Sequence, residues 1–164
     1  MSVDRFGRWP SPLTVEEVAV GRMSRSNLSS DGMWLYWLES RPEQSGRVVL
    51  VRARQGYRSE QLLPPGTSVR SRVHEYGGGA YCLLTRSPAG SSASPEETTG
   101  FAYVQESDQR IYLWWPGNDA PIPLTPEAPR GERWNHGGLS SAGDGRWVLA
   151  VRERHHGASG VSGG

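Results

Sequence analysis

The sequence contains no lysine, only one cysteine and no long hydrophobic run. All 18 basic residues are arginine, which we attribute to GC-rich codons rather than to a functional need for guanidinium groups. A single cysteine excludes a disulfide within the chain. Because Cys82 lies in an apolar run, we expect its thiol to be buried and unreactive. The apolar runs are far shorter than the ~20 residues that a membrane-spanning helix needs.

The net charge is small, and no targeting signal is evident. The formal net charge of +1 gives no electrostatic reason to expect nucleic acid or an anionic membrane as a partner. Residues 1–12 include charged side chains and no apolar stretch, so they do not read as a secretory signal. The sequence therefore predicts a cytoplasmic protein that has no membrane partner.

Turn-forming and aromatic residues are abundant instead. The 164 residues include 21 glycines, 12 prolines, seven tryptophans and six tyrosines. Glycine and proline punctuate short strands, and the aromatic residues argue against disorder. We therefore expect an all-β fold. Strands are predicted where apolar residues gather between polar turns, at 33–38, 47–54, 61–63, 101–104, 110–115 and 140–153, with two extended pieces within 69–84.

The flanks and one internal stretch are expected to differ from the strand-rich part. Residues 13–20 are the one good helix candidate, because Thr14 and Glu17 have the spacing of a capping box and Gly21 follows. The predicted organisation is a lead-in segment with this helix at 1–22, a β-domain at 23–154 that contains a flexible Ser/Pro/Thr/Glu-rich insertion at 87–100, and a flexible tail at 155–164.

An internal repeat is the most informative feature. Segments 30–35 and 143–148 both place an aromatic-led strand directly after a tight Asp-Gly turn. With the insertion set aside, they are separated by roughly two units of about 50 residues, and the blades of a β-propeller are four-stranded units of roughly that length. The repeat predicts a partial β-propeller of about two to three blades. Chance similarity between two short strands is the alternative.

Four ordered motifs resemble one group of enzymes. Residues 37–43 (WLESRPE) resemble the first blade of prolyl oligopeptidase family serine peptidases, in particular the dipeptidyl-peptidase and acylaminoacyl-peptidase-like enzymes. Residues 73–81 (VHEYGGGAY), 108–112 (DQRIY) and 123–126 (PLTP) resemble further hallmarks of that group, and 9–14 resembles its N-terminal lead. Residues 134–138 (WNHGG) depart from the pattern, because the family usually has an Ala-Asp pair there.

The resemblance implies a role without bond cleavage for this chain. In the family, an N-terminal propeller gates the access of short peptides to a C-terminal α/β-hydrolase domain, which carries the Ser, Asp and His of the catalytic triad. We expect that domain to be the chain's missing downstream partner, and short peptides to be the substrates of the full-length enzyme. No complete triad is recognisable here, so no catalytic residue is assigned, and no cofactor is expected.

One segment is a candidate for contact with substrate or with the catalytic domain. The resemblance suggests that it lines the inner channel or faces the hydrolase domain, while turn structure alone is the alternative. A His-Glu pair could serve acid–base chemistry, but no third partner is evident. Glycine in an extended segment often marks the close approach of another backbone. The candidate residues are His74, Glu75, Tyr76, Gly77, Gly78 and Gly79.

Other suggestive residues favour structural interpretations. Ser162 fits a Gly-x-Ser-x-Gly pattern, but that motif acts only between a strand and a helix, so we expect a flexible tail there. His155 and His156 would point to opposite faces of a strand, and we expect solvated tail histidines and no metal site. Tryptophans in two sets could offer a stacking platform for a ligand, but alternation predicts that one of each set packs between blades. These sets are Trp34 with Trp37, and Trp114 with Trp115.

Two rival hypotheses remain beside the propeller fragment. The chain could be a self-contained small β protein that acts as a binding or interaction module, or a nonfunctional truncated remnant. A closed propeller ring needs about four blades or more, and the sequence offers fewer. A terminal blade without a neighbour would expose an apolar face and unpaired strand edges. We therefore expect poor solubility or self-association of this chain on its own.

Overall fold

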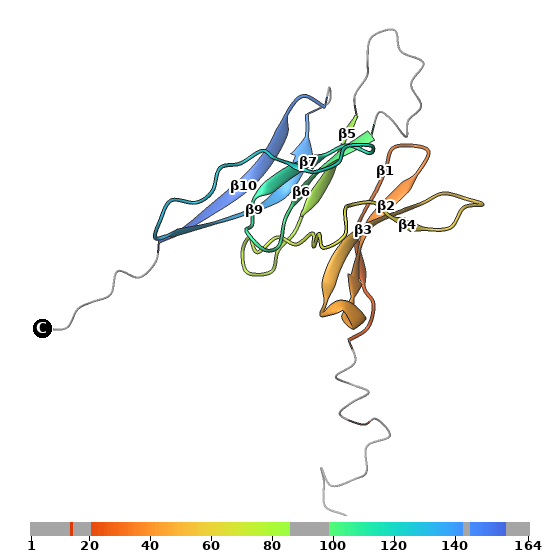
Figure 1. Ribbon diagram of the computed structural model, residues 1–164, viewed down its shortest axis with the longest axis horizontal. Coiled ribbons are helices and arrows are strands. Elements are labelled where there is room, and N and C mark those ends of the chain that lie inside the picture. Colours follow the sequence, from red (N-terminus) through yellow and green to blue (C-terminus); the bar gives the residue numbers. More distant parts are fainter. Residues whose placement is uncertain (1–13, 15–20, 86–98, 143–144, 157–164) are drawn as a thin grey trace, which may run out of the picture.

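The computed structural model describes residue 14 and residues 21–85, 99–142 and 145–156. These residues form three antiparallel sheets, none of them closed, and contain no α-helix (Figure 1). The first sheet has the order β1-β2-β3-β4, the second β5-β6-β7-β8, and the third pairs β9 with β10. The strands are β1 (Arg25–Ser30), β2 (Leu35–Arg41), β3 (Arg47–Ala53), β4 (Glu60–Gln61), β5 (Tyr81–Thr85), β6 (Thr99–Val104), β7 (Ile111–Trp114), β8 (Ile122–Pro123), β9 (Glu132–Ser141) and β10 (Val148–His156), and a 3-10 turn, η1 (Pro42–Gln44), follows β2.

The Asp-Gly turn between β1 and β2 forms because one carboxylate organises it. One oxygen of Asp31 accepts the backbone N–H groups of Met33 and Trp34 at 2.9 and 2.8 Å. The other oxygen accepts the Tyr36 hydroxyl at 2.6 Å and the Thr99 hydroxyl of β6 at 3.1 Å. Burial opposes ionisation of Asp31, but these hydrogen bonds outweigh it and lower its pKa. The turn therefore also fastens the first sheet to the second.

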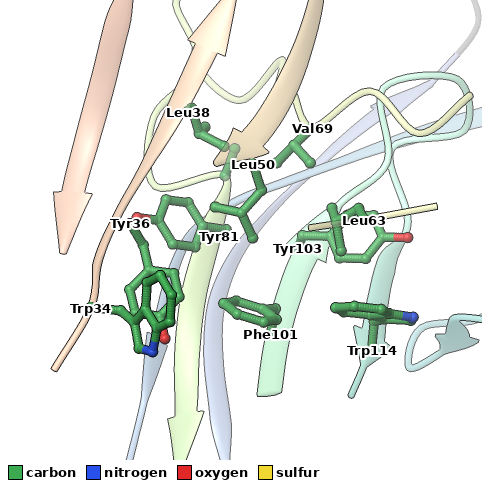
Figure 2. Close-up of a cluster of buried hydrophobic side chains, with 11 residues drawn as sticks. Trp34, Tyr36, Leu38, Leu50, Leu63, Val69, Tyr81, Phe101, Tyr103 and Trp114 are labelled. Carbon is green, nitrogen blue, oxygen red and sulfur yellow. The ribbon is translucent and has the colours of Figure 1, made fainter. Parts of the chain in front are cut away.

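The main core lies between the first and second sheets (Figure 2). Tyr36 of β2 and Phe101 of β6 meet edge to face, with ring centroids 5.5 Å apart, and Phe101 stacks on Trp114 at 6.1 Å. Tyr36 and Phe101 are 0% and 1% exposed. Aromatic side chains bury large apolar areas, so this contact contributes much of the stability of the pair of sheets. The cluster contains Trp34, Tyr36, Leu38, Leu50, Leu63, Val69, Ala80, Tyr81, Phe101, Tyr103 and Trp114.

The second sheet is covered on both faces. All residues of β6 are buried, including Ala102 and Val104, which point away from the main core into a second cluster with Trp115 and Leu139 of β9. A strand that is buried on both faces has no polar alternation, as the sequence of β6 shows. Gly100 permits this packing, because a Cβ there would lie 2.5 Å from the Trp115 ring. The third sheet thus stacks on the second as the second stacks on the first.

The hairpins β1–β2 and β9–β10 repeat one another in detail. In the first, the register shifts between Ser26 and Ser29 as the partners advance from Leu38 to Tyr36. In the last, Val151 pairs with Gly137 and Leu149 with Ser140, which is the same irregularity. The residue after Ser26 and the residue after Gly137, Asn27 and Gly138, both have positive φ, of 53° and 60°. The repeat seen in the sequence therefore corresponds to a shared strand geometry.

The structure differs from the sequence predictions at several boundaries. Most of β9 was not predicted, because only its last residues, 140–141, fall within the strand predicted at 140–153. The segment 134–138, which departs from the family pattern, lies within β9. Strand β10 continues to His156 and so occupies the start of the predicted tail, and β6 begins at Thr99, inside the predicted insertion at 87–100. Both differences arise because cross-strand pairing extends a strand through polar residues. Apart from Thr14, which is not helical, the helix predicted at 13–20 lies outside the described residues.

Candidate functional site

The candidate segment, residues 74–79, is a tight turn in the connection from β4 to β5, and it lies against β9. His74 and Glu75 have positive φ values of 53° and 63°. The three glycines that follow, Gly77, Gly78 and Gly79, have φ values of 73°, 140° and 50°. Non-glycine residues adopt such angles uncommonly, and the cost is tolerated where surrounding contacts fix the conformation. The contacts of this turn therefore need to be strong.

Side chains of neighbouring strands and loops supply these contacts. The Ser71 hydroxyl donates to the carbonyl oxygen of His136 at 2.6 Å and accepts the N–H of Val73 at 3.1 Å. The buried Gln109 accepts the N–H of Arg72 at 2.7 Å through its side-chain oxygen. Its own backbone carbonyl lies 2.7 Å from Nδ1 of the buried His136. The base of the turn is thus tied to both the second and the third sheet.

At Gly78 and Gly79 the turn lies directly against the backbone of β9. The N–H groups of Gly138 and Leu139 in β9 donate to the carbonyls of Gly78 and Gly79 at 3.0 and 2.8 Å. A Cβ at Gly79 would lie 2.7 Å from the Cα of Gly138, and one at Gly137 would lie 2.5 Å from the Ser71 hydroxyl. Real Cβ atoms essentially never lie within 3.0 Å of another heavy atom. The close approach expected from the glycines is confirmed, and its partner is the glycine pair of β9.

His74 is held by a carboxylate of β10. Its Nδ1 lies 2.8 Å from Oε1 of Glu153, and its backbone N–H donates to the same oxygen at 2.8 Å. The backbone hydrogen bond from His74 is the main reason why the pKa of Glu153 lies below its ordinary value, against a smaller opposing effect of desolvation. The neighbouring Glu75 is not the partner of His74 in an acid–base pair. The pairing fixes the turn and offers no nucleophile to activate.

Tyr76 projects from the turn between two cavities. Its side chain is 96% exposed, and it lines both a cavity of about 830 Å³ and one of about 430 Å³. The larger cavity is lined by residues of the first sheet, of the loop before the turn and of the turn itself, including Gly77 and Gly78. The smaller is polar and includes Arg70, Arg72 and Arg133 beside Glu75. The turn therefore divides two spaces that a molecule can enter.

A third hollow lies along the first strands of the three sheets. It has a volume of about 470 Å³ and is lined by 27–29 of β1, 81–83 of β5 and 139–141 of β9. The Tyr81 hydroxyl donates to the carbonyl of Asn27 at 2.6 Å and lies 2.6 Å from the Ser29 hydroxyl, so it links β1 to β5. Cys82 lines the hollow and is partly buried, and burial raises its thiol pKa to about 11. The thiol is therefore protonated and a weak nucleophile.

The remaining sequence candidates have structural positions. His155 belongs to β10 and lies 3.3 Å from the Asn135 amide nitrogen, so it is not a tail residue. Ser162 lies outside the described residues. Of Trp34 and Trp37, only Trp34 is buried, as the prediction of one core residue per set requires. Trp114 and Trp115, in contrast, are both buried, on opposite faces of the second sheet. Both are buried because a sheet lies on each side of the second, which the alternation rule did not foresee.

The described part of the chain holds neither a metal-binding cluster nor a membrane-spanning helix. It contains no group of three or more His, Cys, Asp or Glu side chains that could hold a metal ion. Within these same ranges, no helix has the length and apolar character required to cross a bilayer.

The similar proteins are peptidases. No family model and no curated protein matches the sequence. A solved structure of a puromycin-hydrolysing peptidase from Mycobacterium tuberculosis is 31% identical and aligns with 93% of this chain at a TM-score of 0.68. A puromycin hydrolase mutant complexed with PGG is 28% identical over 87% of the chain, with a TM-score of 0.63. Another puromycin hydrolase structure is 26% identical over 94%, with a TM-score of 0.60.

These alignments span only part of the neighbours. The chain covers 22%, 21% and 25% of the lengths of the three peptidases. Sequence identity and fold agree over nearly all of this chain, and the match is to the N-terminal part of the larger proteins. The chain therefore resembles a fragment of the prolyl oligopeptidase-family peptidases.

Proposed function

We propose that the chain is the N-terminal β-propeller portion of a prolyl oligopeptidase-family serine peptidase of the dipeptidyl-peptidase or acylaminoacyl-peptidase-like group. In this proposal the first and second sheets are complete blades, and the β9–β10 hairpin is the beginning of a third. The observation that carries the proposal is the agreement of fold and sequence with the puromycin-hydrolysing peptidase over 93% of the chain.

The position of the hollows supports a role in substrate admission. The first strand of each sheet lines the hollow between β1, β5 and β9, as the inner strands of propeller blades line a central channel. The turn at 74–79 borders two further cavities, and the exposed Tyr76 lies where a passing peptide or the catalytic domain would touch it. In this proposal the segment forms part of the channel wall and gates short peptides, and bond cleavage belongs to an α/β-hydrolase domain.

A chimera tests this proposal. The segment of the Mycobacterium tuberculosis puromycin-hydrolysing peptidase that aligns with this chain is replaced by residues 7–156, and puromycin hydrolysis is measured. A deletion of the same segment serves as the control. The proposal predicts a folded chimera that hydrolyses puromycin well above the deletion control. A folded chimera with no more activity than the deletion would refute it.

Gating needs a second readout within that chimera. Replacement of the exposed Tyr76 by Ala leaves the packing of the turn intact, because the side chain is 96% exposed. We expect kcat/KM for peptides of several residues to change by a few-fold while kcat/KM for a single aminoacyl amide stays constant. Leu124→Ala, also at an exposed apolar position, is the matched control. Equal effects on both substrates would remove the gating role from this turn.

A further inference from the structure

A polar cavity lies between the turn at 74–79 and β9. Its volume of about 430 Å³ falls within the range of roughly 300–1,000 Å³ that is typical of ligand pockets. Its walls come from the connection between β4 and β5, from the connection between β6 and β7, and from β9 and β10. These elements are already joined to one another by hydrogen bonds, so the cavity belongs to the interior of the stack and not to one of its open ends.

The polar cavity carries an excess of positive charge. Arg70, Arg72 and Arg133 line it, against two carboxylates, Glu75 and Glu106. With the lining histidine neutral, three positive and two negative charges leave one positive charge. Glu106 is paired with Arg70 at 3.6 Å. Within residues 21–85, 99–142 and 145–156, neither Arg72 nor Arg133 has an ion-pair partner, so two guanidinium groups are available to one anionic group.

The backbone that carries these guanidinium groups is held in place. The N–H of Arg72 donates to the side-chain oxygen of Gln109 at 2.7 Å. The carbonyl of Arg72 accepts Nδ2 of Asn135 and the N–H of Glu75, both at 3.2 Å. Arg133 belongs to β9, which pairs with β10. A planar guanidinium matches the two oxygens of a carboxylate, and a fixed backbone reduces the conformational freedom that is lost on binding.

Asn135 adds an acceptor to this cationic wall. It is 2% exposed and lines the polar cavity, and its Nδ2 is occupied by the Arg72 carbonyl. Its Oδ1 has no hydrogen-bond partner among the residues that the structure describes. Buried polar atoms are nearly always hydrogen-bonded, so this oxygen requires a donor from elsewhere. The last residue of a peptide brings both groups, a carboxylate and a neighbouring amide N–H, whereas acetate and inorganic phosphate bring no N–H.

We propose that the polar cavity binds the C-terminal carboxylate of a short peptide, with Arg72 and Arg133 on the carboxylate and Oδ1 of Asn135 accepting the N–H of the last residue. Tyr76 lines both this cavity and the larger one of about 830 Å³, so the preceding residues of the peptide extend past Tyr76. One carboxylate cancels the excess charge, whereas a phosphate group carries about two negative charges. The choice of a peptide as ligand rests on the proposed function.

Binding to the full 164-residue chain tests the site without any hydrolysis. N-acetylated tetra-alanine with a free C-terminal carboxylate is compared with its C-terminal amide by isothermal titration calorimetry at pH 7 and low ionic strength. The acid is expected to bind about five-fold or more tightly than the amide, the effect of ion pairs at an accessible site. Methylation of the last amide nitrogen of the acid removes its N–H and is expected to weaken binding by a few-fold.

Substitutions locate the binding on the chain. Arg72→Gln and Arg133→Gln are each expected to remove most of the preference for the acid and to leave the affinity for the amide unchanged. Arg58→Gln is the matched control, because Arg58 is exposed in the connection between β3 and β4 and does not line the polar cavity. Circular dichroism and thermal melting verify that the variants fold like the wild type.

Three outcomes overturn the proposal. Equal binding of acid and amide, or no binding of either, means that no carboxylate is recognised. A loss of the preference in Arg58→Gln as large as that in Arg133→Gln assigns it to net charge alone. An N-methylated acid that binds as well as the parent removes Asn135 from the site. The proposed function fails separately: an inactive chimera leaves these binding results standing, and an active chimera beside equal binding of acid and amide loses only the carboxylate site.

Discussion

Replacing Gly79 by alanine tests whether the triple glycine is required by backbone contact. Gly79 has a φ of 50°, and an added Cβ would lie 2.7 Å from the Cα and 3.0 Å from the N of Gly138. The neighbouring strands would have to separate, which breaks the hydrogen bonds from Gly138 and Leu139 to Gly78 and Gly79. The left-handed conformation costs about 1 kcal/mol for alanine, and each lost backbone hydrogen bond about 1 kcal/mol.

The expected result is a loss of about 3 kcal/mol in the free energy of unfolding, measured by urea denaturation with tryptophan fluorescence. Gly66→Ala is the matched control. Gly66 also has positive φ, at 84°, but an added Cβ there meets nothing within 4 Å. It should lose only the conformational part, about 1 kcal/mol. If Gly79→Ala is no more destabilising than Gly66→Ala, the backbone contact with β9 does not require glycine and the reasoning is wrong.

Three further predictions concern named side chains. Asp31→Ala removes the acceptor of four hydrogen bonds and should lower the free energy of unfolding by about 2–4 kcal/mol in urea denaturation, with a smaller loss for Asp31→Asn, which keeps the turn acceptor. The pKa of Glu153 is lower in the folded state than in the unfolded state, so the hydrogen bond from the His74 amide is fully formed above the unfolded-state pKa and is lost as pH falls through the folded-state pKa. Hydrogen exchange of the His74 amide, corrected for intrinsic rates, should therefore accelerate as pH falls through the folded-state pKa. An unchanged protection factor would contradict this. Burial raises the pKa of Cys82 to about 11, so its reaction with a disulfide reagent at pH 8 should be about 100-fold slower in the folded chain than in urea, and equal rates would contradict this.

The sequence predicts the fold class and most of the strands because strong local signals carry them. Asp31 accepts the backbone N–H of Trp34 and so forms the turn that precedes β2. An Asp-Gly turn followed by an aromatic residue is therefore a local signal that the sequence shows directly. Most of strand β9 was missed because its residues 134–138 are mostly polar or glycine. Its pairing with β10 and its backbone contact with Gly78 and Gly79 determine its conformation, and both are long-range effects.

The candidate site shows the same division. The glycines at 77–79 correctly indicated a close backbone, but the sequence could not tell which one, since Gly137 and Gly138 lie far along the chain. The partner of His74 was also missed. Glu153 lies in another sheet, and adjacency in sequence wrongly favoured Glu75. Burial of both Trp114 and Trp115 depends on sheets on either side, which no local pattern encodes.

A double-mutant cycle on Tyr36 and Phe101 tests most directly whether the first sheet packs face to face on the second. Their rings meet edge to face at 5.5 Å across the first and second sheets. Tyr36→Leu, Phe101→Leu and the double variant are compared with the wild type by urea denaturation. The structure predicts a coupling energy of about 1 kcal/mol, typical of a buried aromatic pair. Additive effects of the two substitutions would show that these faces are not in contact and would contradict the stacking of the sheets.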